Sequence, residues 1–135
     1  MFDLEGKFSS PAKLERAKIC LDEMIKTVKE QYEVTHSYEC GMDLAMSYNN
    51  LGILLDDLGK HSEARKSYEE AVELREALTD ETDAIGDRRD LADSYNNLGD
   101  VLRKLGKLSE ARKVYEDAIY ILKSLAVETE SIKDR

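Results

Sequence analysis

Apolar residues recur along most of this chain at intervals of three and four positions, which is the spacing of one face of an α-helix. One stripe consists of Leu44, Tyr48, Leu51, Leu55 and Leu58. A second stripe repeats the pattern with Leu91, Tyr95, Leu98, Leu102 and Leu105. The pattern predicts an all-α fold in which both stripes face the core.

The chain contains an internal repeat with an offset of 47 residues. Residues 44–52 recur almost unchanged as residues 91–99. The same offset aligns residues 58–60 with 105–107, 62–66 with 109–113 and 68–69 with 115–116. A fainter match places Ala17 under Ala64, so an incomplete copy precedes the two full ones.

Each full copy is predicted to form two helices. Gly59 and Gly106 follow the first helices, where glycine readily adopts the left-handed backbone that ends a helix. Ser62 and Ser109 are placed to cap the second helices. The second helices carry small, aromatic and aliphatic residues on one face: Ala64, Tyr68, Ala71 and Leu78, then Ala111, Tyr115, Ala118, Leu122 and Leu125.

These elements predict one domain, residues 1–135, of about five helices. It comprises a degenerate partial repeat at residues 11–40 and full repeats at residues 44–82 and 91–130. Ser10 followed by Pro11 predicts the first helix start, because proline at the first helical position loses no hydrogen bond.

The residues Tyr48, Leu51, Gly52 and Leu55, followed by Ala64, Tyr68 and Ala71, are similar to the tetratricopeptide repeat, and the second copy matches equally well. Tyrosine stands at the family's usual tryptophan, and Glu76 and Lys123 replace its terminal proline. The copies are 47 residues long rather than about 34, which resembles the repeats of kinesin light chains. The resemblance implies a solenoid of helical hairpins with a right-handed superhelix.

The resemblance also implies that the first helix of each copy lines a concave, ligand-binding face. The residues predicted to contact a partner there are Asn49, Asn50, Ile53, Asn96, Asn97 and Asp100. Asparagine is unfavourable inside a helix, yet a pair of asparagines occurs at the same place twice, and each amide can both donate to and accept from a peptide backbone. The alternative is that these amides are inherited with the repeat or bond one helix to another.

The charge of this face limits the partner. Family members that bind the C-terminal carboxylate of heat-shock chaperones have a lysine where this chain has Asn49 and Asn96. Asp93 and Asp100 would repel a carboxylate ligand. We therefore expect a scaffold or adaptor that binds, through this concave face, a protein or peptide partner that is basic or neutral.

The last helix offers a second surface. Val114, Tyr120, Leu122 and Val127 replace polar or charged residues of the preceding copy, so this helix is expected to need cover. Residues 132–135 match the residues just before a full copy. The alternatives to an adaptor are therefore a homo-oligomer that pairs through this helix, a longer repeat array, or a sensing module of a larger effector protein.

Composition narrows the function classes. Twenty basic residues against 29 acidic ones give a net charge of -9, which disfavours binding to nucleic acid or to anionic membranes. The first residues do not have the pattern of a secretory signal, and no apolar stretch approaches the roughly 18 residues of a membrane span. A cytoplasmic protein is expected.

Candidate chemistry is sparse. Cys20 and Cys40 are isolated, and neither His36 nor His61 has partners at the spacing of a catalytic triad or metal site. The acidic residues at 80–87 lack the spacing of a calcium loop and are expected to form a solvated turn. We therefore expect no enzymatic activity, no cofactor and no bound metal.

Overall fold

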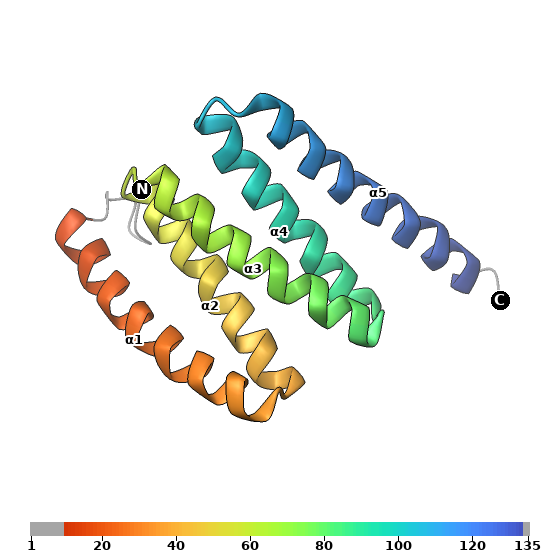
Figure 1. Ribbon diagram of the computed structural model, residues 1–135. Coiled ribbons are helices and arrows are strands. Elements are labelled where there is room, and N and C mark those ends of the chain that lie inside the picture. The colour runs from red at the N-terminus through yellow and green to blue at the C-terminus, as the bar shows by residue number, and fades with distance from the viewer. Residues whose placement is uncertain (1–9, 134–135) are drawn as a thin grey trace.

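The computed structural model describes residues 10–133, and every regular element among them is a helix. The helices are α1 (Pro11–Thr35), α2 (Tyr38–Asp57), α3 (His61–Thr82), α4 (Ile85–Lys104) and α5 (Leu108–Lys133). Figure 1 shows two hairpins, α2 with α3 and α4 with α5, and places α1 beside α2 at one edge and α5 at the other. The predicted all-α solenoid of about five helices is confirmed. None of the helices described is both long and apolar enough to cross a membrane.

The predicted ends of the first helices are confirmed. Gly59 and Gly106 adopt φ values of 78° and 77°, in the left-handed region that glycine enters without strain. The amide of Lys60 then donates to the carbonyl of Leu55 at 2.8 Å, which closes the helix end. The start of α1 is also as predicted, with Pro11 in its first turn and the Ser10 hydroxyl accepting from the Lys13 amide at 3.2 Å.

The prediction that Ser62 and Ser109 cap the second helices is wrong. Helix α3 begins at His61, its capping position is Lys60, and no side chain caps it. Helix α5 begins at Leu108, so Ser109 also lies inside a first turn. The reason is that Lys60 both closes α2 and precedes α3, which leaves no separate position for a serine cap.

Small residues let the helices approach closely. Ala64, Ala71 and Ala118 have no exposed surface. Gly52 of α2 lies directly on the ring of Tyr68 of α3, and Gly99 of α4 lies in the same way on Tyr115 of α5. The main apolar cluster draws on α2, α3, α4 and α5, whereas Ile25 is the sole buried residue of α1. Helix α1 is therefore packed on one side only.

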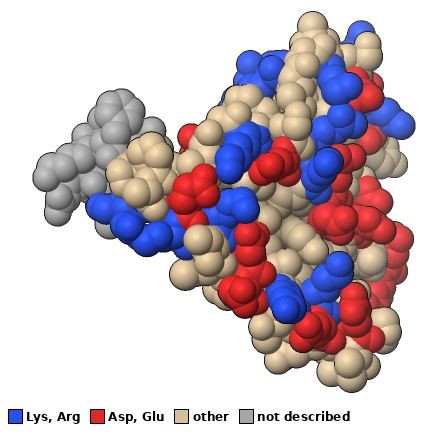
Figure 2. Space-filling model, turned by 60° about the vertical axis from the view of Figure 1, so that its left-hand side comes forward, with Lys and Arg blue, Asp and Glu red and all other residues tan. Residues whose placement is uncertain are grey.

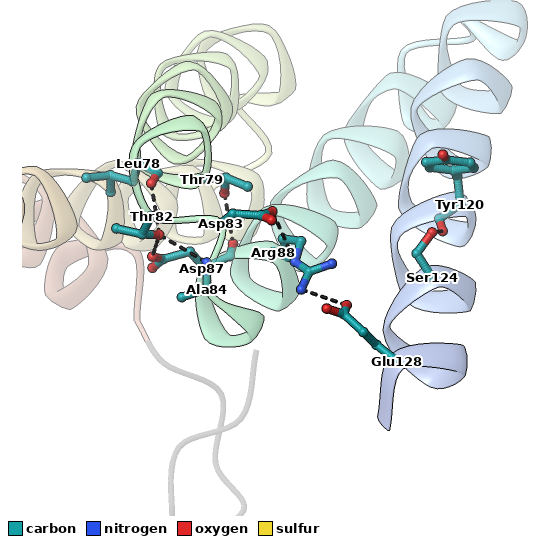
Figure 3. Close-up of polar contacts among 10 residues, drawn as sticks. All are labelled: Leu78, Thr79, Thr82, Asp83, Ala84, Asp87, Arg88, Tyr120, Ser124 and Glu128. Carbon is teal, nitrogen blue, oxygen red and sulfur yellow. Dashed lines mark hydrogen bonds and ion pairs between the residues drawn. The ribbon is translucent and has the colours of Figure 1, made fainter. Parts of the chain in front are cut away.

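A buried carboxylate joins three helices at one end of the molecule, and Figure 3 shows its contacts with α3. Asp87, in the first turn of α4, is 6% exposed. Its Oδ1 accepts a hydrogen bond from the Tyr38 hydroxyl at 2.6 Å, and its Oδ2 accepts one from the Thr82 hydroxyl. The Thr79 hydroxyl donates to its backbone carbonyl at 3.2 Å. The expectation that residues 80–87 form a solvated turn is therefore wrong at Asp87.

Candidate protein-binding surface

Side chains at matching positions of α2 and α4, all exposed except the half-buried Asn97, form two stripes that we call the α2–α4 face. The stripe on α2 consists of Met46, Asn50, Ile53 and Asp57. The counterparts on α4, 47 residues later, are Asp93, Asn97, Asp100 and Lys104. Met46 is 49% exposed and Ile53 is 44% exposed, so both large apolar side chains are open to solvent. The face therefore carries exposed apolar groups on α2 and exposed carboxylates on α4.

Two of the predicted contact residues bond to each other. The Asn97 side-chain amide donates to Asn49 Oδ1 at 2.8 Å, and both side chains are half-buried between α2 and α4. This hydrogen bond realises the alternative that such amides join one helix to another. The pair therefore holds the two first helices in register.

The other four predicted contact residues lie differently. Asn50 and Ile53 are exposed and line a groove between α1 and α2. Asn96 is half-buried. Asp100 is exposed and accepts a hydrogen bond from the Tyr115 hydroxyl of α5. Burial and this hydrogen bond both raise the pKa of Tyr115, so its hydroxyl stays a donor to Asp100 at neutral pH.

A second cross-link between the first helices was missed by the sequence analysis. Asp56 of α2 accepts from Lys104 Nζ of α4 at 2.6 Å, and its other oxygen lies 2.6 Å from His61 Nδ1. Both the Asp56–Lys104 pair and the Asn49–Asn97 pair are separated by 48 residues. The signal was present in the repeat, since facing positions of successive first helices are one residue further apart than the repeat length.

Charges of both signs are mixed over the face of the molecule shown in Figure 2. Several basic residues there are adjacent to acidic ones, and ion pairs such as Lys18–Asp22 at 3.1 Å and Lys60–Glu15 at 3.2 Å lie on α1 and the start of α3. A nucleic-acid surface needs clustered, unpaired cations. On this face the basic side chains are instead mixed with acidic ones, which disfavours binding of nucleic acid.

The four residues predicted for self-association divide into two groups. Tyr120 is 74% exposed and Val127 is 70% exposed, and Leu122 is also exposed on α5. Val114 instead is half-buried against the main apolar cluster, in a groove that Tyr95 and Leu98 also line. Three of the four residues are thus exposed on α5, and Val114 is not.

A metal site would need several ligating side chains close together. Between residues 10 and 133, no three His, Cys, Asp or Glu side chains lie together as a metal ion would require. Cys20 and Cys40 are both free thiols.

Tandem helical hairpins that repeat in sequence, joined by equivalent contacts, define a helical repeat protein. The family model of the tetratricopeptide repeat matches residues 44–81 and 91–126, which together make up more than half of the chain. The chain belongs to the tetratricopeptide repeat family, as the sequence predicted, and its repeats are of the kinesin light chain type. No curated protein matches the chain significantly.

Proposed function

We propose that this protein is an adaptor that holds a partner peptide on the α2–α4 face. Tetratricopeptide repeats generally mediate protein–protein interaction and serve as non-catalytic scaffolds. The observation that carries the proposal here is that Met46 and Ile53 are exposed on α2, while Asp93 and Asp100 are exposed on α4, which hydrogen bonds join to α2. An apolar surface rimmed by charge is the common form of a protein-binding site.

The surface selects a partner by two interactions. Met46 and Ile53 provide an apolar contact for one or two side chains of a peptide. Asp93 and Asp100 favour lysine or arginine next to those side chains, because opposite charges increase both the encounter rate and the specificity. Asn50 offers an exposed amide that can donate to and accept from the peptide backbone.

Peptide selection against the protein is expected to enrich sequences with an apolar residue flanked by Lys or Arg. Binding of such a peptide should weaken at least about tenfold, or about 1.4 kcal/mol, in the Asp93→Lys/Asp100→Lys double variant. Ile53→Ser should weaken it similarly. Fluorescence anisotropy with the labelled peptide measures both effects.

Asp80→Lys is the control, because Asp80 is an exposed carboxylate on α3 away from this face. It changes the net charge without changing the α2–α4 face. Enrichment of acidic peptides, or equal weakening by Asp80→Lys, would contradict the proposal.

Self-assembly is the second candidate function, favoured by the exposed apolar side chains of α5. A C2 dimer would bury Tyr120 and Val127 against their copies. Light scattering behind size exclusion is expected to show a concentration-dependent dimer that Tyr120→Glu abolishes with helicity unchanged. Gln31→Glu, which adds the same charge to an exposed position of α1, should leave the dimer intact. A monomer at every concentration would exclude this candidate.

A further inference from the structure

Helix α1 exposes the face that its counterpart α3 buries. Ala64, Ser67, Tyr68 and Ala71 of α3 are between 0% and 5% exposed, because α2 packs on them. The residues 47 positions earlier on α1 are Ala17, Cys20, Leu21 and Met24. Leu21 is half-buried, the other three are exposed, and Met24 has 55% of its surface exposed. The repeat therefore carries one helix-packing face that no helix of the described residues covers.

The contacts that hold α2 show what such a face does. The Ser67 hydroxyl of α3 donates to the Tyr48 carbonyl of α2 at 2.6 Å, and the Tyr68 ring packs against Gly52. Helix α4 adds two contacts through residues that lie 48 positions after their partners, Asn97 to Asn49 and Lys104 to Asp56. Helix α2, the first helix of its copy, is thus bound by α3, the second helix of the same copy, and by α4, the first helix of the next copy.

The same set of positions forms a groove between α1 and α2, with a volume of about 460 Å³. Helix α1 contributes Leu14, Ala17, Cys20, Leu21 and Met24. Helix α2 contributes Asn50, Ile53, Leu54 and Asp57. The residues 47 positions later along the chain lie on α3 and α4, where α2 is bound. In this comparison Asn50 corresponds to Asn97, and Asp57 corresponds to Lys104.

We propose that this groove binds an amphipathic α-helix of another protein, placed on α1 and α2 as α2 is placed on α3 and α4. Its apolar face packs on Leu14, Leu21 and Ile53, and a Lys or Arg near its C-terminal end pairs with Asp57. The end groove shares Asn50, Ile53 and Asp57 with the α2–α4 face but does not include Asp93 or Asp100, and binding of a helix there goes beyond the peptide-binding function proposed above.

Three replacements define the chemistry of the bound helix. Leu14 corresponds to His61 of α3, and Ile53 corresponds to Asp100 of α4. The groove is therefore more apolar than the surface of α3 and α4 on which α2 lies. Asp57 takes the place of Lys104, which binds the Asp56 carboxylate of α2. The helix bound in this groove therefore needs a cation where α2 has Asp56. A cation in the last turn is also favoured by the helix dipole.

The environment of Asp57 agrees with this assignment. Partial burial, followed by repulsion from Asp56, raises the pKa of Asp57. Asp56 itself is already bound by His61 and Lys104. A partner cation beside Asp57 would relieve this repulsion.

Helix α2 supplies the probe for a direct test. The probe is a labelled peptide of residues 38–58 with Cys40→Ser, made both with Asp56 and with Asp56→Lys. Each peptide is titrated against the wild-type chain and against Asp57→Lys. The Asp56→Lys peptide is expected to bind the wild-type chain at least tenfold more tightly than the Asp56 peptide does, and Asp57→Lys should reverse this order.

Two further measurements locate the binding site. Bound peptide should protect Cys20, which lines the groove, from alkylation, whereas the reactivity of Cys40 should stay constant. Leu21→Glu should abolish binding, and Asp93→Lys should leave it unchanged. Loss of binding in Asp93→Lys would place the peptide on the Asp93 and Asp100 side of the α2–α4 face. That result would overturn the end-groove proposal and leave the adaptor function standing.

The proposal is overturned if affinity does not depend on the charge combination, if Leu21→Glu has no effect, or if neither peptide binds or protects Cys20.

A chain that lacks residues 1–9 provides the remaining comparison. Binding seen only with that shortened chain would assign the groove to the first residues of this protein rather than to a partner helix.

Discussion

Gly52→Ala is expected to destabilise the protein by about 3 kcal/mol, even though alanine is the better helix former by about 1 kcal/mol. An added Cβ would lie 2.5 Å from Tyr68 Cε1 and 2.7 Å from Tyr68 Cδ1. The Tyr68 ring is 5% exposed, so it cannot turn away without opening the contact between α2 and α3. The steric cost therefore exceeds the gain in helix propensity.

Urea denaturation followed by circular dichroism measures the change in the free energy of unfolding. Gly86→Ala is the matched control, because Gly86 also lies in a helix but an added Cβ would meet no atom within 4 Å. That variant should be stabilised by about 0.5–1 kcal/mol. If Gly52→Ala were stabilised to the same extent, the close approach of α2 to Tyr68 would not be a rigid feature of the fold.

The sequence predicts most of the fold because the determining interactions are local or repeated. Apolar stripes with steps of three and four residues identify the first helices. Gly59 and Gly106 mark the ends of these helices, because a left-handed backbone depends on the residue itself and not on distant partners. The capping prediction for Ser62 and Ser109 failed for a related reason. One residue can end one helix and begin the next, and a list of preferred capping residues does not show this.

The candidate site is less predictable, because its residues act through partners on other helices. The sequence marks Asn49 and Asn97 as unusual residues for a helix, but only the arrangement of α2 and α4 in space makes them partners of each other. Comparison of the repeats predicts that Val114 is exposed on α5, yet it is half-buried against the main apolar cluster. Asp87 was grouped with its acidic neighbours although two hydroxyls from other helices bury it.

Asp87→Ala is expected to destabilise the protein by about 2 kcal/mol, which is large for a change in an acidic inter-helix segment. The Asp87 carboxylate is buried and accepts from hydroxyl groups of α2 and α3, so alanine leaves those donors without their acceptor. Asp87→Asn keeps the shape and one acceptor oxygen, and its effect should be intermediate. Asp80→Ala, at an exposed position of α3, should change stability by less than about 0.5 kcal/mol.

The Tyr38 phenol provides an independent measure of the same interaction. Its hydrogen bond to Asp87 is the main cause that raises the pKa of Tyr38 above its ordinary value. A raised tyrosine pKa adds stability that is fully present below about pH 10 and is lost as the pH rises through the folded-state pKa. The stability difference between wild type and Asp87→Ala should therefore narrow above about pH 10.

Tyrosinate absorbance of the wild type, Asp87→Ala and Tyr38→Phe separates this phenol from the other tyrosines. In Asp87→Ala the pKa of Tyr38 should fall toward its ordinary value, while Asp80→Ala should leave it raised. An unchanged pKa together with unchanged stability would mean that Asp87 does not join α2 to α4 in solution. Among the residues that the structure describes, the direct polar links between α2 and α4 would then be the Asn49–Asn97 and Asp56–Lys104 contacts.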